Sequence, residues 1–379
     1  MPTLLIAYGT RPEAIKLGPV IRELRQSRLE SIVITSGQHR EMLDEVNDLF
    51  DVRPDLDLSV MQPRQTLEEL TARVFDGYSS ALRDLRPDAL LVQGDTTTSF
   101  VAALCGFYAK VPVVHLEAGL RTNDRYAPFP EEINRRLTTQ LSSLHLAPTN
   151  RNRAALLREG INPDVVVVTG NTVIDALIWA SKLRQPFDDS VLEAASICHR
   201  RIVLVTAHRR EAWGQGMNAI ASGIARVAEA FPDVLFVFPM HRNPIVRESL
   251  LPALVDHENI YVREPMPYGK FARLIGESSI IVTDSGGLQE EAPGLGKPTL
   301  VLREETERVE AVEVGAAKLV GLDTALIVAE LSNLLANQAA YDSMARTASP
   351  YGDGVASARV RKSIEHLLGL GPQVQDFVP

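Results

Sequence analysis

The sequence predicts an α/β protein with two domains, each built on a doubly wound parallel sheet. Short apolar, β-branched runs alternate with helical stretches along the whole chain, which is the pattern of repeated βαβ units. The 379 residues exceed what one hydrophobic core usually serves, so two cores are expected. A polar segment over 183–190 marks the domain boundary. We therefore expect domains over 1–184 and 185–355, followed by a C-terminal helix and tail over 356–379.

The first half begins with a strand at 4–8 and a turn into a helix. Pro12 suits the first position of that helix, and Pro19 is expected to kink it. An extended link over 51–63 follows the second helix, and Glu131 is expected to open a later one. The other strands expected in this half are 31–35, 89–92, 111–116 and 165–168.

The second half repeats the alternation of strands and helices. The final helix is expected over about 356–368, after a turn that contains Pro350 and Gly352. The strands expected in this half are 202–205, 234–238, 260–262, 280–283 and 299–302, which complete a second sheet.

Composition and charge narrow the class of partner. The chain is 45% hydrophobic and 23% charged, as in ordinary globular proteins. Its formal net charge is −9 and it has no long run of lysine or arginine, which argues against nucleic acid or an anionic membrane as the main partner. No apolar run approaches the roughly 18 residues that a transmembrane helix needs. The N-terminus lacks the features of a signal peptide, so we expect a cytoplasmic protein.

Common cofactor, metal and nucleophile motifs are absent. Cys105 and Cys198 have no metal-ligand spacing and imply no disulfide framework. No G-x-G-x-x-G follows the first strand, and Gly296-Lys297 precedes Pro298 where a P-loop needs Ser or Thr. Neither G-x-S-x-G nor H-E-x-x-H occurs. These absences weaken the redox, ATPase, hydrolase and zinc interpretations.

The stretch 280–293 gives the clearest indication of a ligand. An apolar strand is followed by Asp284, Ser285 and two glycines, and then by helix-forming residues. A helix that starts after such a turn presents free N–H groups and the positive end of its dipole, which suits a phosphate. An ordinary strand-to-helix connection would show the same pattern of residues, so this stretch alone does not establish a phosphate site.

Three acids and several basic residues follow strand ends or lie beside turns. If the two sheets face one crevice, Asp95, Glu117 and Glu131 could act there as general acids and bases. Helix capping is a competing role for Asp95, which precedes three threonines. The basic residues favour a local anion site, and they are Arg11, Lys16, His208, Arg209, Arg210 and Arg308.

Six motifs together resemble the bacterial non-hydrolysing UDP-N-acetylglucosamine 2-epimerases, and they occur in that family's order along nearly the whole chain. They are GTRPEAIK at 9–16, GDTTT at 94–98, EAGLRT at 117–122, PEE at 130–132, GNTVID at 170–175 and DSGGLQEEAP at 284–293.

The resemblance implies a fold, a substrate and a set of site residues. It implies two Rossmann-like domains of the glycosyltransferase-B type that face a cleft, usually in a homodimer, with no NAD and no metal. The implied catalytic residues are Asp95, Glu117, Glu131 and His208. The residues implied to bind UDP are Arg11, Lys16, His208, Phe271, Ser285, Gly286, Gly287, Glu291 and Arg308. In some members a second, activating UDP-N-acetylglucosamine (UDP-GlcNAc) is held at positions that correspond here to Gln38, His39, Arg64, Gln65, Arg209 and His241.

The implied reaction interconverts UDP-GlcNAc and UDP-N-acetylmannosamine (UDP-ManNAc). In the family's route, UDP is eliminated to give 2-acetamidoglucal and is then added back, with the proton delivered to the other face of C2. Such an enzyme would supply ManNAc-type sugars for cell-surface polysaccharide. Three alternatives stay open: a hydrolysing epimerase that releases ManNAc, a UDP-sugar glycosyltransferase, and a UDP-sugar sensor without turnover.

Overall fold

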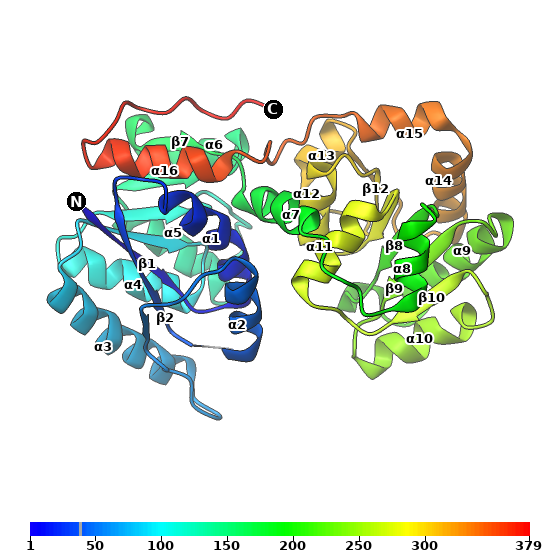
Figure 1. Ribbon diagram of the computed structural model, residues 1–379, viewed down its shortest axis with the longest axis horizontal. Helices are drawn as coiled ribbons and strands as arrows, with labels where there is room; N and C mark the ends of the chain where they lie inside the picture. The colour runs from blue at the N-terminus through cyan, green and yellow to red at the C-terminus, as the bar shows by residue number, and fades with distance from the viewer. Residues whose placement is uncertain (38–39) are drawn as a thin grey trace. The chain divides into compact units, whose positions relative to one another are not determined.

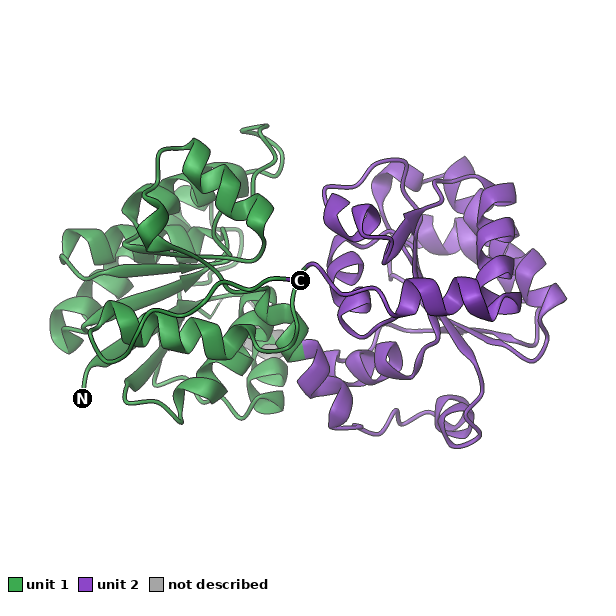
Figure 2. Cartoon of the chain, turned by 90° about the horizontal axis from the view of Figure 1, so that it is seen from above, with its two compact units in different colours: residues 1–176, 351–378 green, residues 177–350, 379 purple. Residues whose placement is uncertain are grey.

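The computed structural model describes residues 1–37 and 40–379, and it forms two compact units that each contain one parallel sheet (Figure 1). One unit comprises Met1–Ala176 and Tyr351–Val378, and the other comprises Leu177–Pro350 with Pro379 (Figure 2). The predicted two-domain α/β class is confirmed. The boundary expected at residue 184 lies within the second unit, and the last helix and tail belong to the first.

The first unit contains a seven-stranded sheet in the order β3-β2-β1-β4-β5-β6-β7, in which every pair of neighbours is parallel. Its central strands are apolar and buried on both faces, as expected where helices cover both sides of a sheet. The direction of strand order reverses between β1 and β4, and this reversal is the topological switch point. The strands are β1 (Thr3–Tyr8), β2 (Glu30–Thr35), β3 (Leu56–Asp57), β4 (Ala89–Gln93), β5 (Val113–Leu116), β6 (Leu144–Ala147) and β7 (Val166–Val168).

The helices of the first unit begin at positions that the local sequence specifies. Thr66 and Thr96 are N-caps whose side chains accept hydrogen bonds from the main-chain N–H groups of Glu69 and Ser99. Glu131 opens α5, as predicted. The helices are α1 (Arg11–Leu24), α2 (Arg40–Leu49), α3 (Leu67–Leu85), α4 (Thr97–Tyr108), α5 (Glu131–Leu141), α6 (Asn150–Arg158), the 3-10 turn Pro163–Val165, the first part of α7 (Thr172–Lys182), and α16 (Ala356–Leu367).

The second unit repeats the same winding in a six-stranded parallel sheet of order β10-β9-β8-β11-β12-β13, and its switch point lies between β8 and β11. The strands are β8 (Ile202–Thr206), β9 (Leu235–Pro239), β10 (Ile260–Arg263), β11 (Ile280–Thr283), β12 (Thr299–Val301) and β13 (Ala317–Leu319). The helices are α8 (Ser190–Ile197), the 3-10 turn Arg210–Ala212, α9 (Gln215–Ala230), α10 (Pro244–Leu254), α11 (Tyr268–Glu277), α12 (Gly286–Gly294), α13 (Val309–Glu313), α14 (Thr324–Ala336) and α15 (Gln338–Ala345).

The chain returns to the first unit through α16, which packs on α1, where Arg361 Nε donates to Glu23 Oε1 at 3.0 Å. The tail beyond α16 then runs beside β7, the last strand of the sheet. Val168 N–H donates to Asp376 Oδ1 at 2.8 Å, and Phe377 N–H donates to the Val168 carbonyl at 2.7 Å. The tail thus satisfies main-chain groups that an edge strand would leave unpaired.

Three strands correct the sequence prediction. The link expected to be merely extended over 51–63 contains β3, a two-residue strand that pairs with β2. In the first unit β6 was not anticipated, and β13 extends the second sheet beyond the strand expected to complete it. Pro12 occupies the second helical position of α1, because the helix begins at Arg11.

Candidate functional site

The switch point of the first unit brings a lysine and a carboxylate together. Lys16, in the second turn of α1, donates from Nζ to both oxygens of Glu117, at 2.7 and 2.5 Å. Gln93, the last residue of β4, also donates to Glu117. Glu117 has a positive φ of 67°, which is uncommon for a residue with a side chain. Non-glycine residues held in this conformation are frequent at functional sites.

Asp95 follows β4 at the same edge of the sheet. Its carboxylate accepts from the buried Arg135 of α5, and its main-chain carbonyl accepts from Asn134 Nδ2 at 3.0 Å. Burial raises the pKa of Asp95 and nearby Glu117 adds to the rise, while Arg135 opposes it. This carboxyl group therefore retains a proton to a higher pH than an exposed aspartate does. The capping role is taken by Thr96 instead.

Glu131 lies at the first position of α5, where a negative charge meets the positive end of the helix dipole. Its Oε2 atom is buried and has no hydrogen-bond partner among residues 1–37 and 40–379. Buried polar atoms are nearly always satisfied, so an unsatisfied one calls for an explanation. A bound ligand is one such explanation for Glu131.

In the second unit, Asp284 organises the end of β8. It follows β11, is fully buried, and accepts the main-chain N–H groups of His208 and Arg209 at 2.6 and 2.7 Å. The Nδ1 atom of His208 lies 3.0 Å from Asp284 Oδ1. Burial alone would raise the pKa of Asp284, but the contacts from His208 and Arg209 outweigh it and lower that pKa. Asp284 is thus a buried anion that fixes the turn after β8.

The start of α12 has the geometry of an anion site. Ser285 is the N-cap and Gly286 is the first helical residue. A Cβ atom at Gly286 would lie 3.4 Å from the Cζ atom of Arg308 and 3.6 Å from an Nη atom of Arg209. Two guanidinium groups therefore approach the N-terminus of a helix at the switch point of its sheet. All three features attract a phosphate.

The other residues implied to bind UDP lie on α1, α11 and α12. Arg11 is the exposed first residue of α1, and Phe271 is half-buried in α11. Gly287 is exposed at the start of α12, whereas Glu291 is half-buried in its second turn. Arg308 also forms ion pairs with Glu290 and Glu307, at 2.9 and 2.5 Å.

The positions implied for an activator are distributed over both units. In the second unit the ring of His241 stacks on that of His208, with centroids 5.6 Å apart. Arg209 is the residue that follows His208 in the sequence. In the first unit Arg64 is exposed, and Gln65 accepts from Arg73 at 2.8 Å. The two remaining positions, Gln38 and His39, lie outside the described residues.

Neither a metal cluster nor a membrane helix is found in the described part of the chain. Over residues 1–37 and 40–379, no three His, Cys, Asp or Glu side chains are grouped so that they could hold a metal ion. The same residues contain no helix with the length and hydrophobicity that crossing a bilayer requires.

Comparison with known proteins identifies the family. A family model described as UDP-N-acetylglucosamine 2-epimerase matches residues 22–365. The UDP-N-acetylglucosamine 2-epimerase of Salmonella typhimurium is 46% identical over 368 residues, which cover 96% of this chain and 98% of the relative. The chain belongs to the UDP-N-acetylglucosamine 2-epimerase family. The resemblance inferred from the six motifs is therefore confirmed.

Solved structures of UDP-GlcNAc 2-epimerases share the fold. The enzyme of Neisseria meningitidis, bound to UDP-GlcNAc, is 44% identical with a TM-score of 0.82, and the match covers 97% of this chain and 100% of that one. The enzyme of Methanocaldococcus jannaschii, in complex with UDP-GlcNAc and UDP, is 33% identical with a TM-score of 0.75, at the same coverage.

Three residues of the candidate site were not assigned to it from the sequence, and they are Gln93, Glu132 and Arg135. Gln93 contacts Glu117, and a polar residue at the end of an otherwise apolar buried strand could have indicated it. Arg135 contacts both Asp95 and the buried Glu132. The three-residue spacing of Glu132 and Arg135 in α5 permits their ion pair, but no local signal predicts the contact with Asp95.

Proposed function

We propose that this chain interconverts UDP-GlcNAc and UDP-ManNAc by the non-hydrolysing route. The observation that carries the proposal is that one unit of a chain of this family contains three carboxyl groups in different surroundings. Asp95 and Glu117 follow the ends of β4 and β5, and Glu131 opens α5. Glu117 is paired with Lys16, and Asp95 is held by Arg135. Glu131 has a buried oxygen that no other described residue contacts by a hydrogen bond. Such differences allow similar groups to take different parts in proton transfer.

The proposed chemistry begins at C1 of the sugar, because the hydrogen on C2 has no neighbouring carbonyl to acidify it. The C1–O bond breaks and its electron pair leaves with UDP. The positive character left at C1 makes the C2 proton removable, and a carboxylate takes it to give 2-acetamidoglucal. UDP then adds back at C1 while a carboxyl group delivers a proton to the opposite face of C2. The three acids supply these proton transfers.

The second unit supplies the groups that stabilise the departing diphosphate. The start of α12, with Ser285 and Gly286, presents main-chain N–H groups, and Arg308 and Arg209 add two positive charges. His208, held through its main-chain N–H by Asp284, is assigned to the same charge stabilisation. Fixed donors of this kind act where negative charge develops in the transition state.

The decisive experiment is proton NMR of the purified protein incubated with UDP-GlcNAc. Appearance of UDP-ManNAc alone supports the proposal. Release of free ManNAc and UDP would identify a hydrolysing epimerase instead. No change in the sugar would leave a glycosyltransferase or a UDP-sugar sensor, and addition of an acceptor sugar would separate those two.

The fate of the C2 proton tests the elimination route. In heavy water, product formed through 2-acetamidoglucal carries deuterium at C2, because the removed proton exchanges with solvent before re-addition. Mass spectrometry of the product measures this incorporation directly. Hydrogen retained at C2, or a requirement for added NAD, would contradict elimination and point to internal return or a keto intermediate.

We also propose that UDP-GlcNAc activates the enzyme, in a cytoplasmic homodimer that supplies ManNAc-type sugars for cell-surface polysaccharide. The M. jannaschii relative, solved with UDP-GlcNAc and UDP together, supports a second ligand. UDP-ManNAc alone should then react with a lag that a trace of UDP-GlcNAc removes. Replacing Arg64 and Gln65 with alanine should abolish that effect while forward turnover persists at high substrate. Progress curves without a lag in either protein would contradict activation.

A further inference from the structure

Glu132 is a buried carboxylate, and each of its oxygens is bonded. Its side chain is inaccessible to solvent. Oε1 accepts from Arg136 Nε at 2.8 Å. Oε2 accepts from the main-chain N–H of Thr122 at 3.0 Å, from the Thr122 hydroxyl at 3.1 Å and from Arg135 Nη1 at 3.4 Å. A buried charge is tolerated only with such partners, so these contacts fix the geometry around Glu132.

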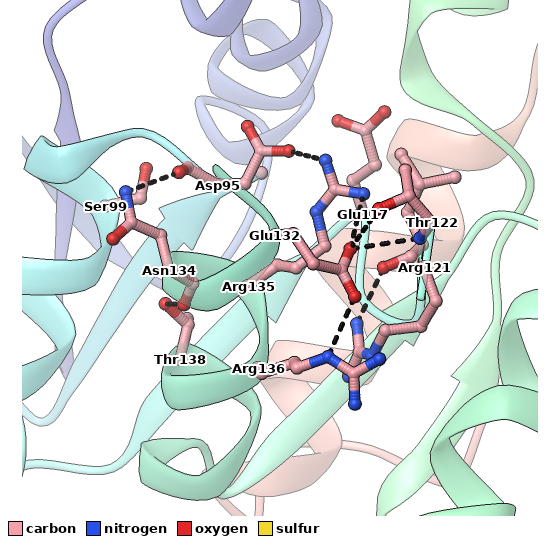
Figure 3. A network of polar contacts seen from close by, with 12 residues as sticks. Asp95, Ser99, Glu117, Arg121, Thr122, Glu132, Asn134, Arg135, Arg136 and Thr138 are labelled. Atoms are coloured by element: carbon pink, nitrogen blue, oxygen red, sulfur yellow. Dashed lines mark hydrogen bonds and ion pairs between the residues drawn. The ribbon is translucent and has the colours of Figure 1, made fainter. Parts of the chain in front are cut away.

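The partners of Glu132 connect it to the acids assigned to catalysis, of which Figure 3 labels Asp95 and Glu117. Arg135 lies between Glu132 and Asp95 and binds both. Thr122 belongs to the loop that follows Glu117, the residue with the positive φ. Glu131 is the adjacent residue in the first turn of α5, so the contacts of Glu132 also fix the start of that helix.

Glu132 and Glu131 differ in a way that separates their roles. Glu131 has a buried oxygen without a partner in the described part of the chain, as expected of a group that meets a ligand. The oxygens of Glu132 are occupied by protein donors and its side chain is not exposed, so it does not contact a substrate. An acid that only complemented the helix dipole at this position would need no contact with Thr122 or Arg135.

We propose that Glu132 is a positioning residue, whose contacts with Thr122 and Arg135 hold Glu117, Asp95 and Glu131 in their reactive arrangement. This inference rests on the proposed epimerisation and deepens it. A displacement of about 1 Å in a reacting group can lower a rate by about a hundredfold, so loss of these contacts should be visible in turnover.

A matched control exists in the same network. Glu159, at the end of α6, accepts two hydrogen bonds from Arg121, both at 2.8 Å, and one from Arg136 at 3.2 Å. Among the described residues it forms no hydrogen bond with Thr122, Arg135 or Asp95. Replacing Glu159 removes a carboxylate from the network and leaves the contacts of Glu132 with Thr122 and Arg135 in place.

The test compares Glu132→Gln with Glu159→Gln in the full-length protein. For Glu132→Gln we expect kcat to fall by about tenfold or more, with KM within about twofold of wild type. The partners of Glu132, which are Thr122, Arg135 and Arg136, are not among the residues implied to bind UDP. For Glu159→Gln we expect kcat within about twofold, whatever its effect on thermal stability. Equal losses in the two variants, or wild-type kcat in Glu132→Gln, would overturn the positioning role.

A second measurement does not depend on turnover. The charged groups around Asp95 are Arg135 from α5, Glu117 from the end of β5 and Lys16 from α1. In Glu132→Gln, Asp95 is the only carboxylate of this pair that still interacts with Arg135, so the pKa of Asp95 should be lower than in wild type. In Glu159→Gln the pKa of Asp95 should be the same as in wild type. Carbon-13 NMR of the aspartate carboxyl groups, assigned with Asp95→Asn, measures this. An unchanged Asp95 titration in Glu132→Gln would overturn the proposal.

The two proposals fail in different ways. Wild-type protein without epimerase activity would overturn the proposed function, while the Asp95 titration would still test the role of Glu132. If Glu132→Gln does not fold, Thr122→Val removes one donor to Glu132 and keeps the main-chain N–H. That variant should fold and lose about threefold or more in kcat with KM unchanged. Wild-type kcat in Thr122→Val would then count against the proposal.

Discussion

Gly286 is the residue at which one added carbon should change nucleotide binding. A Cβ atom there would occupy space that Arg308 and Arg209 border, at 3.4 and 3.6 Å, and that an anion at the helix N-terminus would need. We expect Gly286→Ala to weaken UDP binding by about 1–3 kcal/mol, or about fivefold to a hundredfold in Kd. Gly371→Ala is the control, since Gly371 is not among the residues implied to bind UDP and the nearest contact of an added Cβ is 4.0 Å away in Glu365. Calorimetry with UDP measures both, and equal affinities would contradict the anion site.

Replacing the proposed catalytic carboxyl groups of the first unit should lower turnover without preventing UDP binding. Replacing Glu117 or Glu131 with glutamine keeps the size of the side chain and removes its ability to exchange protons. We expect epimerisation to fall by at least about a hundredfold, while UDP still binds, because the groups assigned to the diphosphate at the start of α12 are unchanged. Full turnover in either variant would remove that residue from the mechanism. Glu30→Gln, an exposed change in β2, is the control.

At the scale of elements, β5 and β6 place two histidines side by side in the interior. His115 and His145 are register partners, and both are buried. Burial lowers the pKa of His115 to about 3 and that of His145 to about 4. Both pKa values lie below the value of about 6.5 in the unfolded chain. As the pH falls below about 6.5, the unfolded chain therefore binds more protons than the folded protein does. The contribution of the neutral histidines to folding stability is therefore present in full above about pH 6.5. It is lost progressively as the pH falls toward about 4 for His145 and about 3 for His115.

We expect the free energy of unfolding to fall between pH 6 and pH 5 by up to about 1.4 kcal/mol per pH unit for each histidine. Urea titrations at several pH values measure this slope. His145→Gln should reduce it, because glutamine does not titrate. A slope equal in wild type and His145→Gln would contradict the assignment.

The strands that were not predicted from the sequence lack a clear local pattern. Strand β3 has two residues and β13 has three, too few for a periodicity to emerge. In β6 the polar His145 interrupts the apolar run, although the strand is buried throughout. The strand and turn before α12 were predicted because apolar residues and turn residues adjoin there. The contact of Asp95 with Arg135 joins residues forty positions apart, and only the assembled sheet creates it.

At the scale of the whole molecule, an exposed aromatic cluster is available for the expected homodimer. Phe107 and Tyr108, at the end of α4, are 56% and 65% exposed, and Tyr108 lies edge-on to Phe75 of α3 at 6.1 Å. Stable interfaces bury about 800 Å² per partner and are enriched in aromatic residues. We expect light scattering to give twice the chain mass, and Phe107→Glu with Tyr108→Glu to give a monomer. Ile197→Glu, a change at a still more exposed position in the second unit, is the control. A dimer that survives the double change would exclude this surface.

The return of Tyr351–Val378 to the first unit has a consequence for the order of events during synthesis. Domains commonly fold from the N-terminus onward as they leave the ribosome. Here the first unit cannot be completed until α16 has been translated, whereas the second is continuous from Leu177 to Pro350 and is available whole beforehand. The nascent chain should therefore carry an unfinished first unit, with the surface of α1 that α16 later covers still open, while its second unit matures. Until its last helix emerges, α1 is a place where a chaperone can bind.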